Sequence, residues 1–250
     1  QGLSQTNVVF IAQDYRGFIW VATGNGLNKL DGYKVKVYKH NPKDSTSIIS
    51  NDIHWVYEDR EKNLWIGTSK GLCRYDRNND WFERIHIPPL PKTATHLYIN
   101  CLYQDRQGKL WIGSGAGAYY LNKDGSIKFY EHDPKNPNTL SNNLVHGFCE
   151  DNDGNLWIAT EKKLNKLDRN TDTFQHFGFN ADPGKSLTHE NISSITVTSA
   201  GTFLIGTRGG GLNIFDPKSE NVVVFRHDEN DEGSLSSDVV ISTLEDKQGN

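Results

Sequence analysis

The stretch D59-R-E-K-N-L-W-I-G-T68, followed by G71-L-C-R-Y-D76, decides the fold because it recurs along the chain. An aspartate with a tryptophan six residues after it occurs four times, in steps of 45, 46 and 46 residues. The four aspartates are Asp14, Asp59, Asp105 and Asp151. A fifth unit carries Thr198 and Leu204 in these two positions, and Asp246 opens a sixth. A fixed period of this length predicts a repeat architecture.

Each repeat contains four short runs of β-branched and aromatic residues, separated by turn residues. No segment has the spacing of an amphipathic helix. The first run is apolar on both faces, as Ile53, Trp55 and Val56 show, which is typical of a strand packed between two neighbours. We therefore predict an all-β fold, a β-propeller of four-stranded antiparallel blades, with the tryptophans filling the space between blades.

The period divides the chain into five complete repeats and the start of a sixth. The repeats cover about 3–49, 50–94, 95–139, 140–186 and 187–234, with a partial one at 235–250. We expect a single β-propeller domain over 1–250 that is incomplete at its C-terminus. Methionine is absent even at position 1, so we expect the first residue to be a processing site or a chosen boundary. An open ring leaves apolar faces uncovered, so we expect the fragment to be poorly soluble by itself.

The composition excludes several classes of function. The 250 residues include 27 Lys and Arg against 31 Asp and Glu, a net charge of −4, which argues against nucleic acid and polybasic membrane binding. No apolar run approaches the ~20 residues of a membrane span. The three cysteines Cys73, Cys101 and Cys149 lack metal-ligand spacing. We therefore predict buried thiols, no metal site and no cofactor.

The repeats resemble the two-component regulator propeller repeat. The resemblance rests on the stretches 59–68 and 71–76, on D151-N-D-G-N-L-W-I-A-T160, and on the blade-linking loops 130–143 and 225–238. It covers nearly the whole chain and weakens at 115–118, at 161–163 and in the fifth repeat.

This resemblance implies the N-terminal part of the sensor domain of a hybrid two-component histidine kinase, of a kind typical of Bacteroidetes. It implies a periplasmic location within an inner-membrane protein, attached through segments outside this chain. It further implies an oligosaccharide ligand, regulation of polysaccharide utilisation, a homodimer formed through the full ectodomain, and no enzymatic activity in this region.

Polar residues recur five positions before the repeated aspartate, within otherwise apolar strands. In a propeller, the loops leading into the first strand share one face with the loops joining strands two and three. Amide, hydroxyl, imidazole and cationic groups on that face suit a neutral or acidic sugar. The predicted ligand-binding residues are His54, Asn100, His146, Ser193, Arg208, Asn25, Lys70 and Asn143. Asn51, Asn142 and Asn143 are equally typical of ordinary turns before a strand.

Other interpretations of the same residues stay open. The D-x-x-G-x-L-W turns are somewhat like those of sialidases, and His54 and His146 could imitate the channel histidines of streptogramin-lyase-like propellers. Asp52 and Glu190 are the acids that a glycosidase mechanism would use. A protein-interaction scaffold is the non-enzymatic alternative. The loop histidines His40, His132 and His227 recur with the period, which predicts a loop-structuring role.

Overall fold

The computed structural model describes residues 2–87, 97–178, 184–246 and 248–249. Within these ranges the chain forms twenty strands and no helix, so it offers no helix that could cross a membrane. Contacts group the chain into two compact units, 1–128 and 129–250, and each is described by itself. The predicted extent of a single domain over 1–250 stays a prediction.

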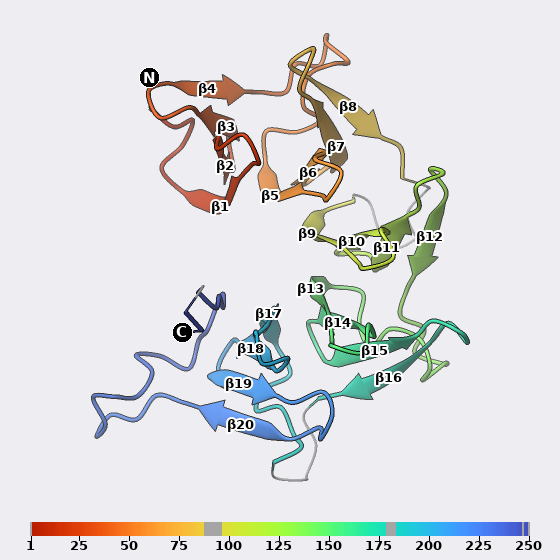
Figure 1. Ribbon diagram of the computed structural model, residues 1–250, viewed down its shortest axis with the longest axis vertical. Coiled ribbons are helices and arrows are strands. Elements are labelled where there is room, and N and C mark those ends of the chain that lie inside the picture. Colours follow the sequence, from red (N-terminus) through yellow and green to blue (C-terminus); the bar gives the residue numbers. More distant parts are fainter. Residues whose placement is uncertain (1, 88–96, 179–183, 247, 250) are drawn as a thin grey trace. The chain divides into compact units, whose positions relative to one another are not determined.

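The strands make five four-stranded sheets, in each of which strands that follow one another in sequence are neighbours (Figure 1). We call these sheets blades one to five in chain order. They are the antiparallel blades of a β-propeller, which confirms the predicted fold class. The strands are β1 Val8–Gln13, β2 Ile19–Thr23, β3 Gly26–Leu30, β4 Val35–Tyr38, β5 Ile53–Glu58, β6 Leu64–Thr68, β7 Gly71–Asp76, β8 Trp81–Ile85, β9 Ile99–Gln104, β10 Leu110–Ser114, β11 Ala118–Leu121, β12 Ile127–Tyr130, β13 Val145–Glu150, β14 Leu156–Thr160, β15 Leu164–Asp168, β16 Thr173–Phe177, β17 Ile192–Val197, β18 Phe203–Thr207, β19 Leu212–Phe215 and β20 Val222–Phe225.

The repeated aspartate builds the turn between the first two strands of a blade. In blade one, Asp14 Oδ1 accepts the backbone N–H of Phe18 at 3.0 Å, and Asp14 Oδ2 accepts the Trp20 indole N–H at 2.9 Å. The same aspartate–tryptophan bond measures 2.8, 2.9 and 2.9 Å in the next three blades. The turn also needs one residue at positive φ, supplied by Gly17 in blade one and by Lys62 in blade two. The turn therefore holds the buried tryptophan indole in its position in the core.

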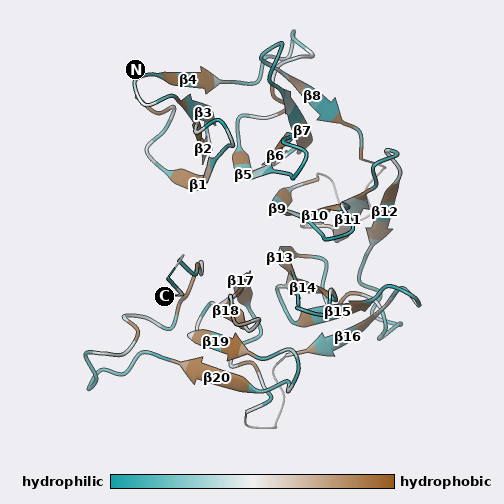
Figure 2. Ribbon diagram, in the orientation of Figure 1, coloured by the Kyte–Doolittle hydropathy of each residue, from teal (hydrophilic) through white to brown (hydrophobic). Residues whose placement is uncertain are grey.

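Within each unit a tryptophan ring lies between neighbouring blades, as predicted. Trp20 is fully buried, and its ring centroid lies 5.9 Å from that of Tyr38 in its own blade and 4.9 Å from that of Tyr75 in blade two. In the second unit, the Trp157 ring lies 5.4 Å from the Phe215 ring of blade five. Hydrophobic residues gather on the strands, whereas the linkers between blades are hydrophilic (Figure 2). Each unit therefore has an aromatic core that joins its blades.

A glycine on the second strand lets the next blade approach closely. A Cβ atom added at Gly67 of β6 would lie 2.7 Å from Ile99 Cγ2 of β9. Such a separation is well inside van der Waals contact, so this position has no room for a side chain.

The linkers that follow blades one, three and five are held by the loop histidines. His40 Nδ1 lies 2.8 Å from the Ile48 carbonyl oxygen, and the His40 backbone N–H donates to Asn51 Oδ1 at 2.7 Å. His132 and His227 repeat both contacts in their own linkers. The predicted loop-structuring role of the three histidines is confirmed.

Three linkers also contact the outer edges of the blades that they lead into. The backbone N–H of Phe82 in β8 donates to the carbonyl oxygen of Thr46, in the linker that precedes blade two, at 2.8 Å. Blades four and five repeat this bond between their outer strand and the linker that leads into them. The pairs are Phe174–Asn138 at 2.9 Å and Val222–Gly184 at 2.6 Å. An outer strand would otherwise present unpaired backbone groups for aggregation.

The residues predicted to open the sixth repeat lie along blade five and form one isolated bridge, Arg208 with Val239. The Val240 N–H donates to the Thr207 carbonyl oxygen at 2.9 Å, while Ile241 and Leu244 are 56% and 83% exposed. An inner strand gains its stability from a second strand beside it, and in the described residues this segment has none.

Candidate functional site at the entrance to the first strands

In blades two to five the loop leading into the first strand meets the loop joining the second and third strands. The backbone N–H of a residue in the second loop donates to a carbonyl oxygen in the first. The pairs are Ser69–Asp52, Gly115–Tyr98, Glu161–Leu144 and Arg208–Asn191, with N···O distances of 3.1, 3.1, 2.9 and 2.9 Å. The prediction that these loops share one end of a blade is confirmed, and the candidate residues of a blade gather there.

In the first unit, His54 lies near the start of β5 and is 8% exposed. Its Nδ1 lies 3.3 Å from the Ile99 carbonyl oxygen, and its Nε2 lies 3.1 Å from Asp52 Oδ1. The ring of Tyr98, 44% exposed, stacks on the imidazole with centroids 3.9 Å apart. His54 therefore links blades two and three, and it supports an accessible aromatic ring beside a half-exposed carboxylate.

In the second unit, His146 of β13 lies within electrostatic range of Glu161 and Arg208. Its Nε2 is buried and has no hydrogen-bond partner in the part of the chain that the structure describes. Burial lowers the pKa of His146 below its usual value; the Glu161 carboxylate opposes this shift, and the Arg208 guanidinium adds to it. The ring is therefore neutral near pH 7, with one polar atom that still requires a partner.

The remaining predicted residues fall into different environments. The Ser193 hydroxyl donates to the Val240 carbonyl oxygen, and Asn143 Oδ1 accepts the His132 backbone N–H at 2.6 Å. Asn25 is exposed and accepts from Lys39 Nζ at 3.1 Å. Lys70 is also exposed, whereas Asn100 is half-buried at the register of His54. Ser193 and Asn143 thus have structural bonds in addition to their place near the entrance.

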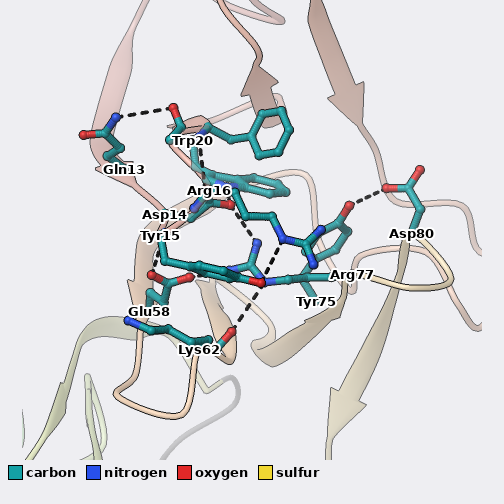
Figure 3. A network of polar contacts seen from close by, with 12 residues as sticks. Gln13, Asp14, Tyr15, Arg16, Trp20, Glu58, Lys62, Tyr75, Arg77 and Asp80 are labelled. Carbon is teal, nitrogen blue, oxygen red and sulfur yellow. Dashed lines mark hydrogen bonds and ion pairs between the residues drawn. The ribbon is translucent and has the colours of Figure 1, made fainter.

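A buried ion-pair network, not predicted from the sequence, lies at the other end of the blades (Figure 3). Arg77 donates to Asp14 Oδ2 at 2.7 Å and to Glu58 Oε1 at 2.5 Å, and its side chain is only 10% exposed. Burial would raise the pKa of Asp14, but the Trp20 and Arg77 hydrogen bonds outweigh it and hold that pKa below its usual range. The signal was available in the sequence, because Glu150 and Arg169 repeat the pair at the same separation.

A second missed cluster joins the outer strand of blade one to the third strand of blade two and to the turn that follows it. The hydroxyls of Tyr38 and Tyr75 both donate to Asp80 Oδ1, at 2.6 and 2.5 Å. Burial first, and then the bond to Asp80, raises the pKa of Tyr75 to about 12. Asp80 also pairs with Lys36, so a single carboxylate holds two phenols and an amine.

The described residues contain no group of three His, Cys, Asp or Glu side chains able to hold a metal ion. Cys73, Cys101 and Cys149 are buried free thiols, as predicted, and burial raises the pKa of each. Asp52 and Glu190 belong to different units, so a glycosidase pair stays a prediction.

Four segments match the family model described as the two-component regulator propeller: residues 2–25, 47–70, 94–116 and 139–162. Each contains the approach to a first strand, the aspartate turn and the tryptophan. These four segments are two-component regulator propeller repeats. A curated relative, "Histidine kinase P4" of Formosa agariphila, is 57% identical to this chain over 47 residues, which are 19% of this chain and 3% of the relative.

Solved structures share the fold of this chain. The extracellular domain of a hybrid two-component system from B. thetaiotaomicron is 24% identical, with a TM-score of 0.70, over 100% of this chain and 38% of that one. Virginiamycin B lyase from Staphylococcus aureus is 13% identical, with a TM-score of 0.63, over 87% of this chain and 69% of the lyase. This chain spans less than half the length of each of these two-component relatives.

Proposed function

We propose that this chain is part of the extracytoplasmic sensing domain of a hybrid two-component histidine kinase and that it binds an oligosaccharide. The family of its repeats supports a signalling role, as does the likeness to a histidine kinase and to extracellular two-component domains. The proposal includes a periplasmic location, regulation of polysaccharide utilisation and a homodimer formed by the whole ectodomain.

The observation that carries the proposal is the buried, unpartnered Nε2 of His146, within electrostatic range of Glu161 and Arg208. A sugar hydroxyl both donates and accepts, so one hydroxyl satisfies the neutral imidazole while its neighbours reach the carboxylate and the guanidinium. Burying a polar atom without a partner costs about 1–3 kcal/mol, which a bound hydroxyl would recover.

The first unit supplies a second set of groups with the same chemistry. Tyr98 presents an exposed ring, on which the apolar face of a pyranose can pack, and Asp52 is a half-exposed acceptor beside it. An aromatic ring next to hydrogen-bonding side chains is a common arrangement in ligand sites.

The test is a thermal-shift and calorimetry screen of the full ectodomain against neutral, uronic and sulfated oligosaccharides. A ligand at 100 times its dissociation constant adds about 2.7 kcal/mol to stability. We expect His146→Ala and Arg208→Ala to lose this gain, and Arg226→Ala, which removes an exposed arginine in the loop after β20, to keep it. If His146→Ala and Arg208→Ala both keep full affinity for the sugar, the proposed binding site is wrong.

Product analysis on the same samples separates binding from catalysis. Disappearance of a sugar during incubation would make the protein an enzyme and contradict the proposal. Light scattering with and without the bound sugar tests the homodimer. No response to any oligosaccharide would favour a protein-interaction scaffold.

A further inference from the structure

A groove of about 590 Å³ lies between blades two and three, within the first unit. Its floor includes Trp65, Ile85, Leu110 and Leu121, and its wall on the aspartate-turn side includes Asp59. The groove therefore lies at the other end of the blades from His54, which is close to the approach to β5. Its volume falls within the usual range for ligand pockets.

The corresponding space between blades one and two is filled by two tyrosines. Tyr38 lies on the outer strand of blade one, opposite Leu27 of β3. Tyr75 lies on the third strand of blade two, opposite Leu64 of β6. Both rings pack against Trp20, and both hydroxyls donate to Asp80. Three rings and one carboxylate thus close that interface.

Aromatic rings also close the interface between blades four and five. Phe177 and Phe215 lie with their centroids 5.0 and 5.4 Å from that of Trp157. Trp20 and Trp157 are both 0% exposed as a result. An interface tryptophan covered by two further rings is therefore found in each of the two units.

The interface between blades two and three lacks both rings. The strand register places Ile85, opposite Leu72, where blade one has Tyr38, and Leu121, opposite Leu110, where blade two has Tyr75. Trp65 is 6% exposed, and the guanidinium of Arg74 lies over its ring, 5.8 Å from the centroid. The two aliphatic side chains thus leave a hollow where the chain elsewhere places aromatic rings.

The rim of this groove carries carboxylates in place of Asp80. Glu83 pairs with Arg74 at 2.6 Å, and Glu61 pairs with Lys123 at 3.2 Å. Their side chains are 52% and 46% exposed, so both carboxylates keep acceptor positions open to solvent. A carboxylate on the rim of an apolar hollow complements a phenol, whose ring is apolar and whose hydroxyl donates.

We propose that this groove is a docking site for a protein partner that inserts a tyrosine side chain. The inserted ring packs on Leu121, Ile85 and the edge of Trp65, as Tyr75 packs on Trp20 in the preceding interface. Its hydroxyl donates to Glu83 or Glu61, and the adjacent Arg74 and Lys123 hold those carboxylates in place. The tyrosine of the partner thus completes a contact that the chain makes for itself between blades one and two.

The test uses p-cresol, which is the tyrosine side chain, as the probe. Binding to the full chain is followed by ligand-observed NMR and by tryptophan fluorescence, to which Trp65 contributes, with methyl α-glucoside as the saccharide control. We expect p-cresol to bind with a dissociation constant on the order of 1 mM, because so few atoms limit the free energy of binding. We expect methyl α-glucoside to leave both signals unchanged.

Leu121→Tyr fills the groove from within and is expected to weaken p-cresol binding at least roughly tenfold, since a packed interior has no room for a second ring. Leu244→Tyr adds the same ring at an 83% exposed position and should leave binding unchanged. Ile85→Tyr repeats the test from the opposite wall if Leu121→Tyr does not fold.

Three results would overturn the proposal. They are no p-cresol binding to the folded wild-type chain, equal binding to the wild type and the filled variants, and binding of methyl α-glucoside that the filled variants abolish. The last would make the groove a saccharide site.

Discussion

Replacing Arg77 by methionine should destabilise the first unit far more than any exposed arginine would. The change keeps most of the apolar stem and removes the guanidinium that joins Asp14 of blade one to Glu58 of blade two. Both carboxylates then stay in place without their cation. Breaking a buried ion pair by removing one partner costs about 3–5 kcal/mol.

The structure places the expected loss at the lower end of that range. Asp14 is 0% exposed but keeps its bonds to Trp20 and the turn, and Glu58 keeps the Tyr15 N–H at 2.8 Å and is 14% exposed. We therefore expect a loss of about 3 kcal/mol at pH 7. For a chain of this size, that corresponds to a melting temperature lower by roughly 6–12 °C.

The loss should also depend on pH, with a sign that follows from Asp14. Its pKa in the folded protein is depressed, so its contribution to stability is complete above the ordinary value of 3.8 and is lost as the pH falls through the folded value. Arg77→Met removes part of that depression. The difference in stability between the two proteins should therefore be largest near neutral pH and shrink below pH 3.8.

Urea titrations followed by tryptophan fluorescence measure the loss, and Trp20, which bonds to Asp14, contributes to that signal. The matched control is Arg74→Met, whose partner Glu83 is 52% exposed and whose own side chain is 43% exposed. That control should lose less than about 1 kcal/mol. Equal losses for the two variants, or a difference that grows at acid pH, would refute the reasoning.

Three further changes test other parts of the fold. Asp151→Ala leaves an indole and two backbone donors unpaired and should cost about 2–4 kcal/mol in urea titrations, whereas Thr198→Ala at the same register should cost under about 1 kcal/mol. Gly67→Ala forces a methyl group against Ile99 and should lower the free energy of unfolding by about 1–3 kcal/mol; an unchanged melting temperature would contradict the close approach. The pKa of His146 is below the ordinary 6.5, so wild-type stability should fall as the pH drops from 6.5 toward that lower value, and His146→Gln should flatten this part of the pH profile measured by thermal melts.

The blade architecture could be predicted from the sequence because its determinants are local. The six-residue spacing of aspartate and tryptophan reports a turn that closes on itself, and short runs of β-branched and aromatic residues between turn residues report the strands. The sixth repeat could not be judged in this way. Its first strand has the expected pattern at Val239 and Ile241, but a strand forms only where a second strand supplies backbone partners, and the pattern does not contain that information.

The candidate site was harder to predict because it depends on pairs from different blades. The register of His54 and His146 was visible, but the partners of the two rings were not. His54 faces the Ile99 carbonyl oxygen of the next blade, whereas His146 Nε2 has no partner among the described residues. Sequence could not separate these two histidines, since burial and packing decide the difference. The groove beside Leu121 was missed for the same reason, because an absent ring is seen only by comparing interfaces.

In blades two, four and five, the bond between the outer strand and the linker that leads into the blade bears on how such chains grow in evolution. The Phe82–Thr46 bond and its counterparts mean that a blade brings the cover for its own outer edge in the residues ahead of its first strand. A duplicated gene segment that begins just after an outer strand therefore encodes a blade with its edge already protected. A segment that begins at the first strand encodes one without that cover. Insertions and losses of whole blades should accordingly have their boundaries after the outer strand, and recombinant shuffling of blades should succeed most often with cuts made there.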